Sequence, residues 1–305
     1  NQAMKSRFVV LLALVLLIAG LGYAQFRGGR FGRGGGTIHY TEGGVAVDEN
    51  TVKTAREVAS HSTGTPNWTN APGFAKDTFT FVRIIRDRSP FSSGGSWITD
   101  FPDSDLNLSY RVQQMTSLKV NPEGRVMRLT NPDLFNYPWI YMVEVGSLEL
   151  RDEEVPILRK YLLNGGFLMV DDFWGERQYE GFYRQLKRVF PEREPVELEM
   201  DHPIFHAVFP IKRTKQEMQV PNERTGERSQ STGITWEYHD GEECRDVHFK
   251  GVFDDKGRMM VFIAHNTDNG DGWEREGENA YFFSEFSEKR AFPLGINVIF
   301  YAMTH

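Results

Sequence analysis

The fold is decided by one stretch in the middle of the chain, residues 163–172, which reads Leu163-Asn164-Gly165-Gly166-Phe167-Leu168-Met169-Val170-Asp171-Asp172. Asn164-Gly165-Gly166 is typical of a helix end, because glycine readily adopts the left-handed backbone that closes the last turn. The apolar residues that follow predict a strand buried on both faces, and the two aspartates end it abruptly. A helix, a glycine turn and an apolar strand in this order indicate a parallel sheet covered by helices.

The same alternation continues on both sides of this stretch. Strands are predicted at residues 79–85, 124–129, 139–145 and 167–170, and helices at 104–116, 152–163 and 176–189. Crossovers between parallel strands are right-handed, which leaves one doubly wound arrangement. The sequence therefore predicts an α/β fold with a mainly parallel, flavodoxin-like sheet.

The two ends of this pattern are less regular. In the C-terminal half, segments 247–253 and 259–264 flank a turn signal and predict a β-hairpin, and an apolar helix ends the chain. Residues 210–233 are polar and are expected to form a long excursion. On the N-terminal side, Asp48 is expected to cap a short amphipathic helix, so that residues 48–77 form a helix and loop before the main domain, 78–305.

The N-terminus predicts export. Lys5 and Arg7 precede the apolar run from Phe8 to Leu21, and the small residues that follow suit cleavage before Gln25. The run is shorter than the roughly 20 residues that a membrane-spanning helix needs, so a signal peptide at 1–24 is favoured over a retained anchor. Residues 25–47, rich in glycine and arginine at their start, are expected to form a flexible spacer.

Charge and cysteine content restrict the partners. The formal net charge is −7, and loss of residues 1–24 would bring it to −9, because that segment contains two cations and no acid. An acidic protein has little electrostatic reason to bind nucleic acid. Cys244 is the only cysteine, so no internal disulfide can form. No stable membrane span is expected after cleavage.

Polar residues gather where the predicted strands end. Ligands of an open parallel sheet bind outside the carboxyl ends of its strands, so the loops beginning at Asp87, Glu144 and Asp171 should meet at one edge. The candidate ligand-binding residues in these loops are carboxylates and indoles: Trp97, Asp100, Asp103, Asp105, Glu144, Asp171, Asp172 and Trp174. Such a set suits a divalent cation or a sugar that stacks on exposed indoles. It does not identify the metal, and the chain has no nucleotide-binding motif.

Each candidate also has a structural interpretation. Asp172 can cap the helix after it, and the two tryptophans can be packing residues. Glu144 is harder to explain structurally, because an acid at the end of a buried strand needs a partner or a raised pKa.

Two histidines and one acidic loop complete the candidates. His202 precedes Pro203 and can bond to the backbone, whereas His265 ends a predicted strand and could reach the same edge. The segment from Asn266 to Asp271 faintly resembles a calcium loop, but its spacing does not match an EF-hand, so a solvated turn is expected.

Several motifs resemble a known family. They are residues 97–107, 163–172, 201–205, 272–274 and 294–298, and together they span the stretch 79–305. This stretch resembles the exported bacterial family catalogued as domain of unknown function 4159. That family is similar to class I glutamine amidotransferase-like and trehalose-utilisation-like domains. The resemblance implies the fold and export, and it implies no demonstrated activity.

The chain departs from the amidotransferases at their nucleophile. Those enzymes place a cysteine just past the strand that follows the Gly-Gly turn, where this chain has Asp171-Asp172. A carboxylate lacks the nucleophilicity of a thiolate, so amidotransfer is not expected.

The expected function is therefore that of an exported, periplasmic or extracellular envelope protein without catalysis. It would bind a small molecule, a glycan or an envelope protein partner at the carboxyl edge. Two alternatives stay open. A metal- or carboxylate-assisted hydrolase of glycans would place Asp171 or Glu144 within reach of His202 or His265. A structural assembly subunit would fill the edge with its own loops.

Overall fold

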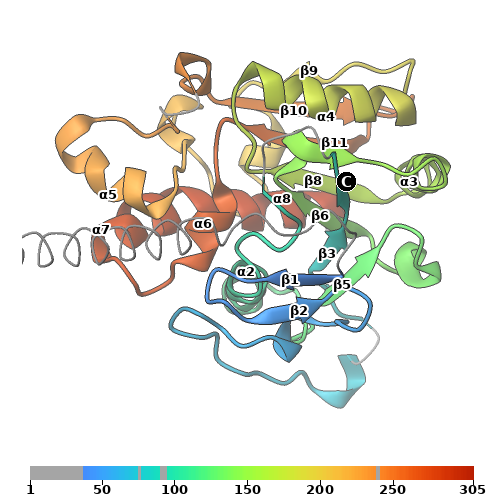
Figure 1. The fold of residues 1–305 in the computed structure, drawn as a ribbon, viewed down its shortest axis with the longest axis horizontal. Helices are drawn as coiled ribbons and strands as arrows, with labels where there is room; N and C mark the ends of the chain where they lie inside the picture. Colours follow the sequence, from blue (N-terminus) through green and yellow to red (C-terminus); the bar gives the residue numbers. More distant parts are fainter. Residues whose placement is uncertain (1–36, 75–76, 90–94, 238–240) are drawn as a thin grey trace, which may run out of the picture. The chain divides into compact units, whose positions relative to one another are not determined.

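The computed structural model describes residues 37–74, 77–89, 95–237 and 241–305. Its centre is a seven-stranded sheet in the order β5-β3-β6-β8-β11-β10-β9 (Figure 1). The strands are β3 (Val82–Ile85), β5 (Arg125–Arg128), β6 (Trp139–Val143), β8 (Phe167–Asp171), β9 (Val196–Glu197), β10 (His248–Phe253) and β11 (Met259–His265). The predicted signal peptide and the first part of the predicted spacer lie outside the described residues.

Five of these strands are parallel and give the sheet its topology. β3 pairs with β5 and β6, and β8 pairs with β6 and β11, all in parallel. Numbered along the chain, the parallel strands lie in the order 2-1-3-4-5, which is the flavodoxin-like order. The predicted fold class is thus confirmed. The strand order reverses between β3 and β6, where such folds bind their ligands.

Helices cover both faces of the sheet because the strand residues are apolar on both sides. Phe81, Tyr141 and Met169 pack on one face with α2 (Asp103–Met115) and α8 (Phe292–Thr304). Alternate residues, such as Val82, Met142 and Val170, pack on the other face with α3 (Glu154–Leu163) and α4 (Gly175–Val189). Each fully buried apolar side chain of this size contributes roughly 1.5–3 kcal/mol, so the two layers hold the sheet.

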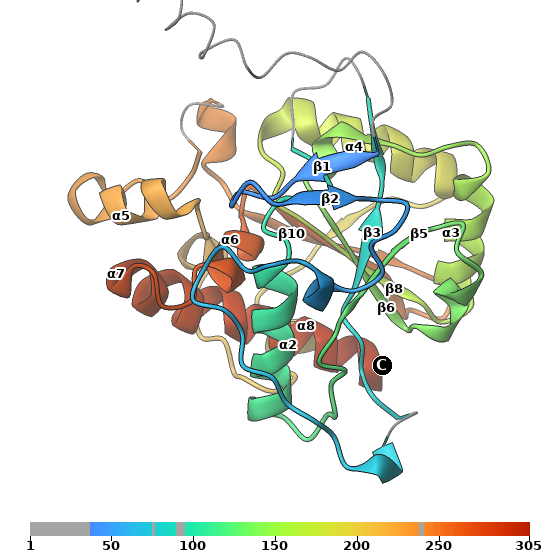
Figure 2. The ribbon, with the colours of Figure 1, turned by 60° about the horizontal axis from the view of Figure 1, so that its bottom comes forward.

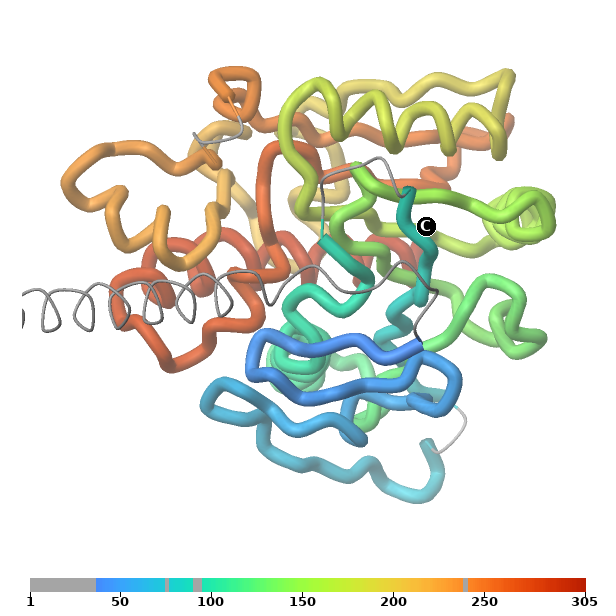
Figure 3. Tube along the Cα trace, in the orientation of Figure 1, coloured from blue at the N-terminus to red at the C-terminus, as the bar shows by residue number. Residues whose placement is uncertain are grey.

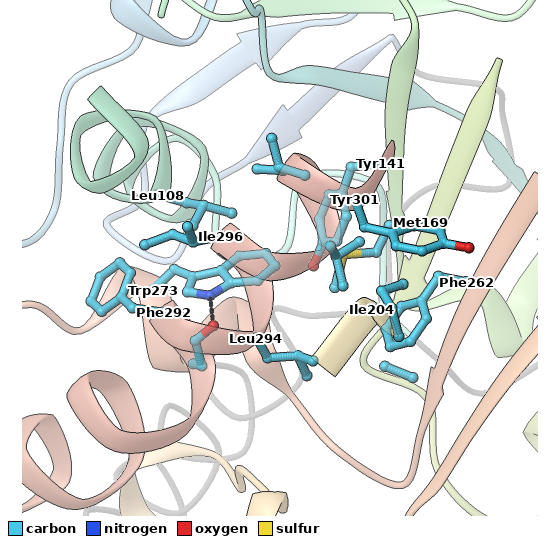
Figure 4. Packing of buried hydrophobic residues seen from close by; sticks show 14 of the residues in the cluster. Leu108, Tyr141, Met169, Ile204, Phe262, Trp273, Phe292, Leu294, Ile296 and Tyr301 are labelled. Carbon is cyan, nitrogen blue, oxygen red and sulfur yellow. Dashed lines mark hydrogen bonds between the residues drawn. The ribbon is translucent and has the colours of Figure 1, made fainter. Parts of the chain in front are cut away.

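The C-terminal part agrees with the predicted hairpin and final helix. β10 and β11 are antiparallel, and β11 is also the last parallel strand of the sheet. Between β11 and α8 lie α6 (Asn269–Glu274), α7 (Ala280–Phe282) and the π-helical segment η9 (Phe283–Ala291). Trp273 of α6 packs among Leu108, Phe292 and Ile296, and its Nε1 donates to Ala291 O at 2.8 Å (Figure 4). This packing anchors α6 beside α2 and α8.

The predicted N-terminal helix is wrong. Residues 38–48 form a hairpin of β1 (Ile38–Tyr40) and β2 (Ala46–Asp48), and the single turn η1 (Ala55–Glu57) stands where the helix was predicted (Figure 2). Apart from one bond within the turn η1, the backbone around Ala55 bonds to the start of β5 and the residues just before it. Ala55 N donates to Glu123 O at 3.0 Å, and Lys53 O accepts from Val126 N at 2.8 Å. Long-range pairing therefore replaces the local helix.

The polar excursion contains a helix that the sequence did not predict. α5 (Glu223–Thr232) is capped by Asn222, whose side chain accepts from Thr225 N, and it ends at Gly233. Gly226 lets the helix pack against Phe282 and Phe286, since a Cβ there would lie 2.5 Å from the Phe282 ring. The orange segment that contains α5 runs beside the red segment that contains α6 and α7 (Figure 3).

The remaining short elements connect these parts. They are η2 (Pro72–Phe74), β4 (Asp87–Arg88), η3 (Pro132–Asn136), η4 (Val145–Ser147), β7 (Leu148–Glu149), η5 (Pro203–Phe205), η6 (Gln216–Met218) and η8 (Glu242–Cys244). Among the described residues, no helix is both long and apolar enough to span a membrane.

Candidate functional site

A polar pocket of about 820 Å³ opens at the carboxyl edge of the sheet. Apart from Trp174, its lining residues are all polar or charged. They are Glu42, Thr99, Asp100, Glu144, Asp172, Trp174, Gln178, Asn222, Glu223, Arg224, Thr225, Arg228, Glu237, Asp268, Asp271 and Arg275. The volume falls within the range that holds small-molecule ligands.

Four of the acids that line this pocket lie in segments that follow parallel strands of the sheet. Asp100 lies in the loop after β3, Glu144 directly follows β6, Asp172 follows β8 and Asp268 follows β11. The structure therefore brings together Asp100, Glu144, Asp172 and Trp174, as the strand directions predicted.

The backbone at this edge is left-handed at four residues. Asp100, Glu144, Asp172 and Asn266 have φ of 60°, 55°, 52° and 60°, and no other non-glycine residue in the described ranges has positive φ. Aspartate and asparagine tolerate this region better than most residues, yet each such position costs of order 1–3 kcal/mol. Strain of this kind concentrates at functional sites.

Three of the aspartates form the core of the pocket, which we call the carboxylate triad: Asp100, Asp172 and Asp268. Each has a carboxylate oxygen within 4.8 Å of the other two, and all three side chains are buried. Asp172 Oδ1 accepts from Trp174 Nε1 at 2.9 Å, and Asp268 Oδ1 accepts from Asp271 N at 2.8 Å. Asp100 Oδ2 is buried without a hydrogen-bond partner among the described residues.

Burial and mutual repulsion disfavour negative charge on the triad. Desolvation raises the pKa of Asp100, Asp172 and Asp268 well above the ordinary value, and neighbouring carboxylates raise it further. No lysine, arginine or histidine nitrogen in the described part of the chain lies within 4.0 Å of a triad oxygen. Bound protons or a bound cation would therefore stabilise the triad.

A second acidic cluster next to the triad differs because its carboxylates pair with an arginine. Glu42, Asp271 and Glu274 lie near Asp100, but Arg275 Nε is 3.1 Å from Glu274 Oε2 and 3.6 Å from Asp271 Oδ1. Arg275 also pairs with Glu42. His61 contacts Glu274 as well, and its Nδ1 lies 3.0 Å from Asp103 Oδ2. Among the described residues, no cationic group thus pairs directly with a triad oxygen, although Arg83 and Arg275 partly oppose the raised pKa of Asp100.

Asp171 lies behind the triad and holds its loop. Its carboxylate accepts from Asn269 Nδ2 at 2.8 Å, Gly270 N at 3.1 Å and the Tyr141 hydroxyl at 3.2 Å. Burial raises the pKa of Asp171 to about 7, although these hydrogen bonds oppose the shift. Since its oxygens are engaged and it does not line the pocket, Asp171 is a positioning residue.

Asp105 and Trp97 also lie outside the pocket. Asp105 forms a buried ion pair with Arg83, with Nη2 2.5 Å from Oδ1. Arg83 in turn donates to Trp97 O at 2.9 Å and Thr99 O at 2.8 Å, which fixes the loop that carries Asp100. The Trp97 side chain is buried against Phe101 and His39. Asp105 and Trp97 therefore help to position the loop that carries Asp100 and do not line the pocket themselves.

The indoles do not form the exposed sugar platform that the sequence suggested. Trp97 is 1% exposed and Trp174 only 6%, although Trp174 contributes to the pocket wall. Asp172 is not a helix cap either, since Trp174 holds the cap position of α4.

The histidines are not among the pocket residues. His202 Nδ1 accepts from Ile204 N at 3.2 Å, and its ring packs against Tyr301. His265 contacts Gly175 O at 3.1 Å, and burial lowers its pKa to about 3. Neither ring forms a recorded hydrogen bond or ion pair with Glu144 or Asp171 in the described chain.

The sequence missed one wall of the pocket completely. Asn222, Arg224, Thr225 and Arg228 come from the start and middle of α5, within the excursion. The expected solvated turn after His265 is also wrong, because Asp268 and Asp271 are 6% and 5% exposed. The alternation of Asn and Asp in that turn was the only signal in the sequence that these residues could belong to a site.

Fold and pocket together define an α/β protein with a flavodoxin-like sheet and an acidic pocket at its switch point. The chain belongs to the family described as Domain of unknown function (DUF4159), which matches residues 80–303. A comparison with curated proteins finds no match.

Proposed function

We propose that this protein is exported, that it binds a divalent cation at the carboxylate triad, and that it uses the cation to hold a polar ligand without catalysing a reaction. The observation that carries the proposal is the buried triad itself, with Asp100 Oδ2 unpartnered in the described structure. A cation would supply the missing partner and relieve the repulsion among the three carboxylates.

The spacing of the oxygens suits a hard cation. Oxygens that share one Ca²⁺ lie about 2.3–2.6 Å from it, and therefore at most roughly 5 Å from each other. The triad oxygens lie within 4.8 Å of one another, and Ca²⁺ or Mg²⁺ fills its other positions with water or ligand oxygens. The open side of the pocket leaves room for both.

Two features support binding without chemistry. Cys244, the single thiol, is fully buried and does not line the pocket. A Cβ on Gly175 would lie 3.4 Å from its Sγ, so the thiol lies beneath the start of α4. The pocket also lacks a histidine among its described lining residues, so the usual general base of thiol chemistry is not at hand.

Titration of metal-free protein with CaCl₂ and MgCl₂ by calorimetry tests the proposal. Asp172→Asn and Asp268→Asn should each weaken cation binding by at least about 10-fold, because each removes one charged oxygen ligand. Asp201→Asn, on an exposed aspartate far along the chain, is the matched control and should bind as the wild type does. Absence of cation binding by the wild type at millimolar concentration would contradict the proposal.

Metal-assisted hydrolysis of a glycan is the second candidate, and the position of Glu144 favours it. This acid lines the same pocket as the triad and raises the pKa of Asp172 further. Under this proposal Glu144→Gln would abolish turnover of glycan substrates and leave cation affinity unchanged. The third expectation, an assembly subunit with a filled edge, is disfavoured by the open pocket of about 820 Å³.

A further inference from the structure

We infer that the ligand of this pocket is an acidic sugar, a polyhydroxy compound whose oxyanion binds Arg224 and Arg228 while the triad cation holds its oxygen atoms. This inference rests on the proposed cation site and adds the chemical class of the ligand. Its basis is that two guanidinium groups without an ion pair to any described residue share one pocket with the acidic triad.

Arg224 and Arg228 have no other assigned role. They lie one helical turn apart on α5, so both can reach the same space. Both are exposed, and neither forms an ion pair or side-chain hydrogen bond with any described residue. Arg275 of the same pocket differs, since it is engaged by Glu42, Asp271 and Glu274. Free guanidinium groups are well suited to bind carboxylate or phosphate oxygens.

The helix that carries these arginines is fixed to the pocket. Glu223 N donates to Asp271 Oδ2 at 2.7 Å, which joins the start of α5 to α6. Gly226, between the two arginines in sequence, packs against the Phe282 ring on the other side of the helix. The backbone of both arginines is thus fixed beside the pocket, while their side chains stay exposed.

The rest of the lining suits hydroxyl groups. Thr99, Gln178, Asn222 and Thr225 offer donors and acceptors, and Glu144 can accept from hydroxyls. A ligand of sugar size fits the volume of about 820 Å³.

The charge of the pocket predicts that the anion binds only with the cation. Carboxyl groups outnumber guanidinium groups in the lining, so the empty pocket repels an anion. A divalent cation at the triad would supply a positive centre to which the oxyanion can bind directly, and the empty pocket lacks this centre. Cation and acidic sugar should therefore raise each other's affinity, by about 10-fold or more.

The test is calorimetry of the full chain with D-galacturonate, D-glucose 6-phosphate, D-galactose and D-glucose, with saturating CaCl₂ or with EDTA. In CaCl₂ the acidic sugars should bind at least about 10-fold more tightly than their neutral counterparts. In EDTA the affinity for the acidic sugars should be lower by about 10-fold or more. The tighter of the two acidic sugars identifies the oxyanion as carboxylate or phosphate.

Arginine variants separate this inference from the cation site. Arg224→Gln and Arg228→Gln should each lower the affinity for the acidic sugars about 10-fold and leave Ca²⁺ affinity unchanged. Arg184→Gln, at an exposed position of α4 outside the pocket, should change neither affinity. Both α5 positions are exposed, so the variants should fold, which melting curves check.

Four results would overturn the inference while the cation site stands. The first is equal affinity for acidic and neutral sugars, and the second is acidic sugar binding that EDTA does not weaken. The third is that both arginine variants bind the acidic sugars as tightly as the wild type does. The fourth is that neither acidic sugar binds the calcium-loaded protein. Failure of the wild type to bind Ca²⁺ would instead overturn the proposed function and this inference with it.

Discussion

At the scale of single residues, the account depends on three carboxylates that the fold forces together. Asp100 and Asp172 could be assigned to one edge from the sequence, because each follows a strand of a parallel sheet. Asp268 could not, because nothing local distinguishes a buried turn from a solvated one. Its burial depends on α6 packing through Trp273, which is a long-range contact.

The raised pKa values predict a pH dependence of cation binding. Because burial and neighbouring carboxylates raise the pKa of each triad aspartate, protons compete with the cation for these oxygens, so cation affinity should rise with pH. Calorimetry in two buffers of different ionisation enthalpy measures the protons released. Cation binding without proton release, and with an affinity that does not rise with pH, would contradict this prediction.

The same shifts predict that Asp172→Asn stabilises the metal-free protein. The folded-state pKa of Asp172 is raised, so this group lowers stability as pH rises above its unfolded value of about 3.9. Asn keeps the acceptor for Trp174 and removes the charge. In EDTA at pH 8 the variant should be more stable by roughly 1–2 kcal/mol, and the gain should shrink at pH 4. Thermal unfolding of the variant and the wild type at both pH values measures the difference in stability. A variant less stable than the wild type at pH 8 would contradict the prediction.

Gly270 provides a steric test of Asp100. A Cβ at Gly270 would lie 2.0 Å from Asp100 Oδ2, so Gly270→Ala must displace this carboxylate from the triad. We expect cation affinity to fall by about 10-fold or more. Gly73→Ala, where a Cβ meets nothing within 4 Å, is the control. Unchanged affinity of Gly270→Ala would remove Asp100 from the site.

At the scale of elements, the loop from β3 to α2 is held by the buried Arg83–Asp105 pair. Arg83→Leu leaves Asp105 buried without its partner, which should destabilise the fold by about 3–5 kcal/mol. Urea unfolding measures the loss. Arg125→Gln, which removes an ion pair of 3.6 Å to the exposed Asp133, should change stability by less than about 1 kcal/mol. Equal effects of the two substitutions would contradict the role of Arg83.

The sequence predicted those elements whose pattern is local. Strands β6 and β8 are continuous apolar runs, and α4 ends where its periodicity ends, so their bounds were close to the observed ones. The segment around Ala55 was assigned to a helix because its apolar spacing fits one. Its backbone instead bonds to Glu123 and Val126, a pairing that no local pattern encodes.

At the scale of the whole molecule, strand order was predictable and closure of the pocket was not. Right-handed crossovers of alternating strands and helices allow few topologies, and the flavodoxin-like order is the one observed. The outer wall comes from α5, more than a hundred residues after β3 in the chain, and its polar sequence looks like a loop. Its helix is stabilised by contacts with Phe282 and Asp271, which are invisible in the sequence.

The central claim is that one divalent cation binds between Asp100, Asp172 and Asp268. A crystal structure of the protein soaked in CaCl₂ tests it most directly. We predict a calcium ion with one oxygen of each triad aspartate about 2.3–2.6 Å away. A calcium-saturated crystal with no ion between these three carboxylates would contradict the account.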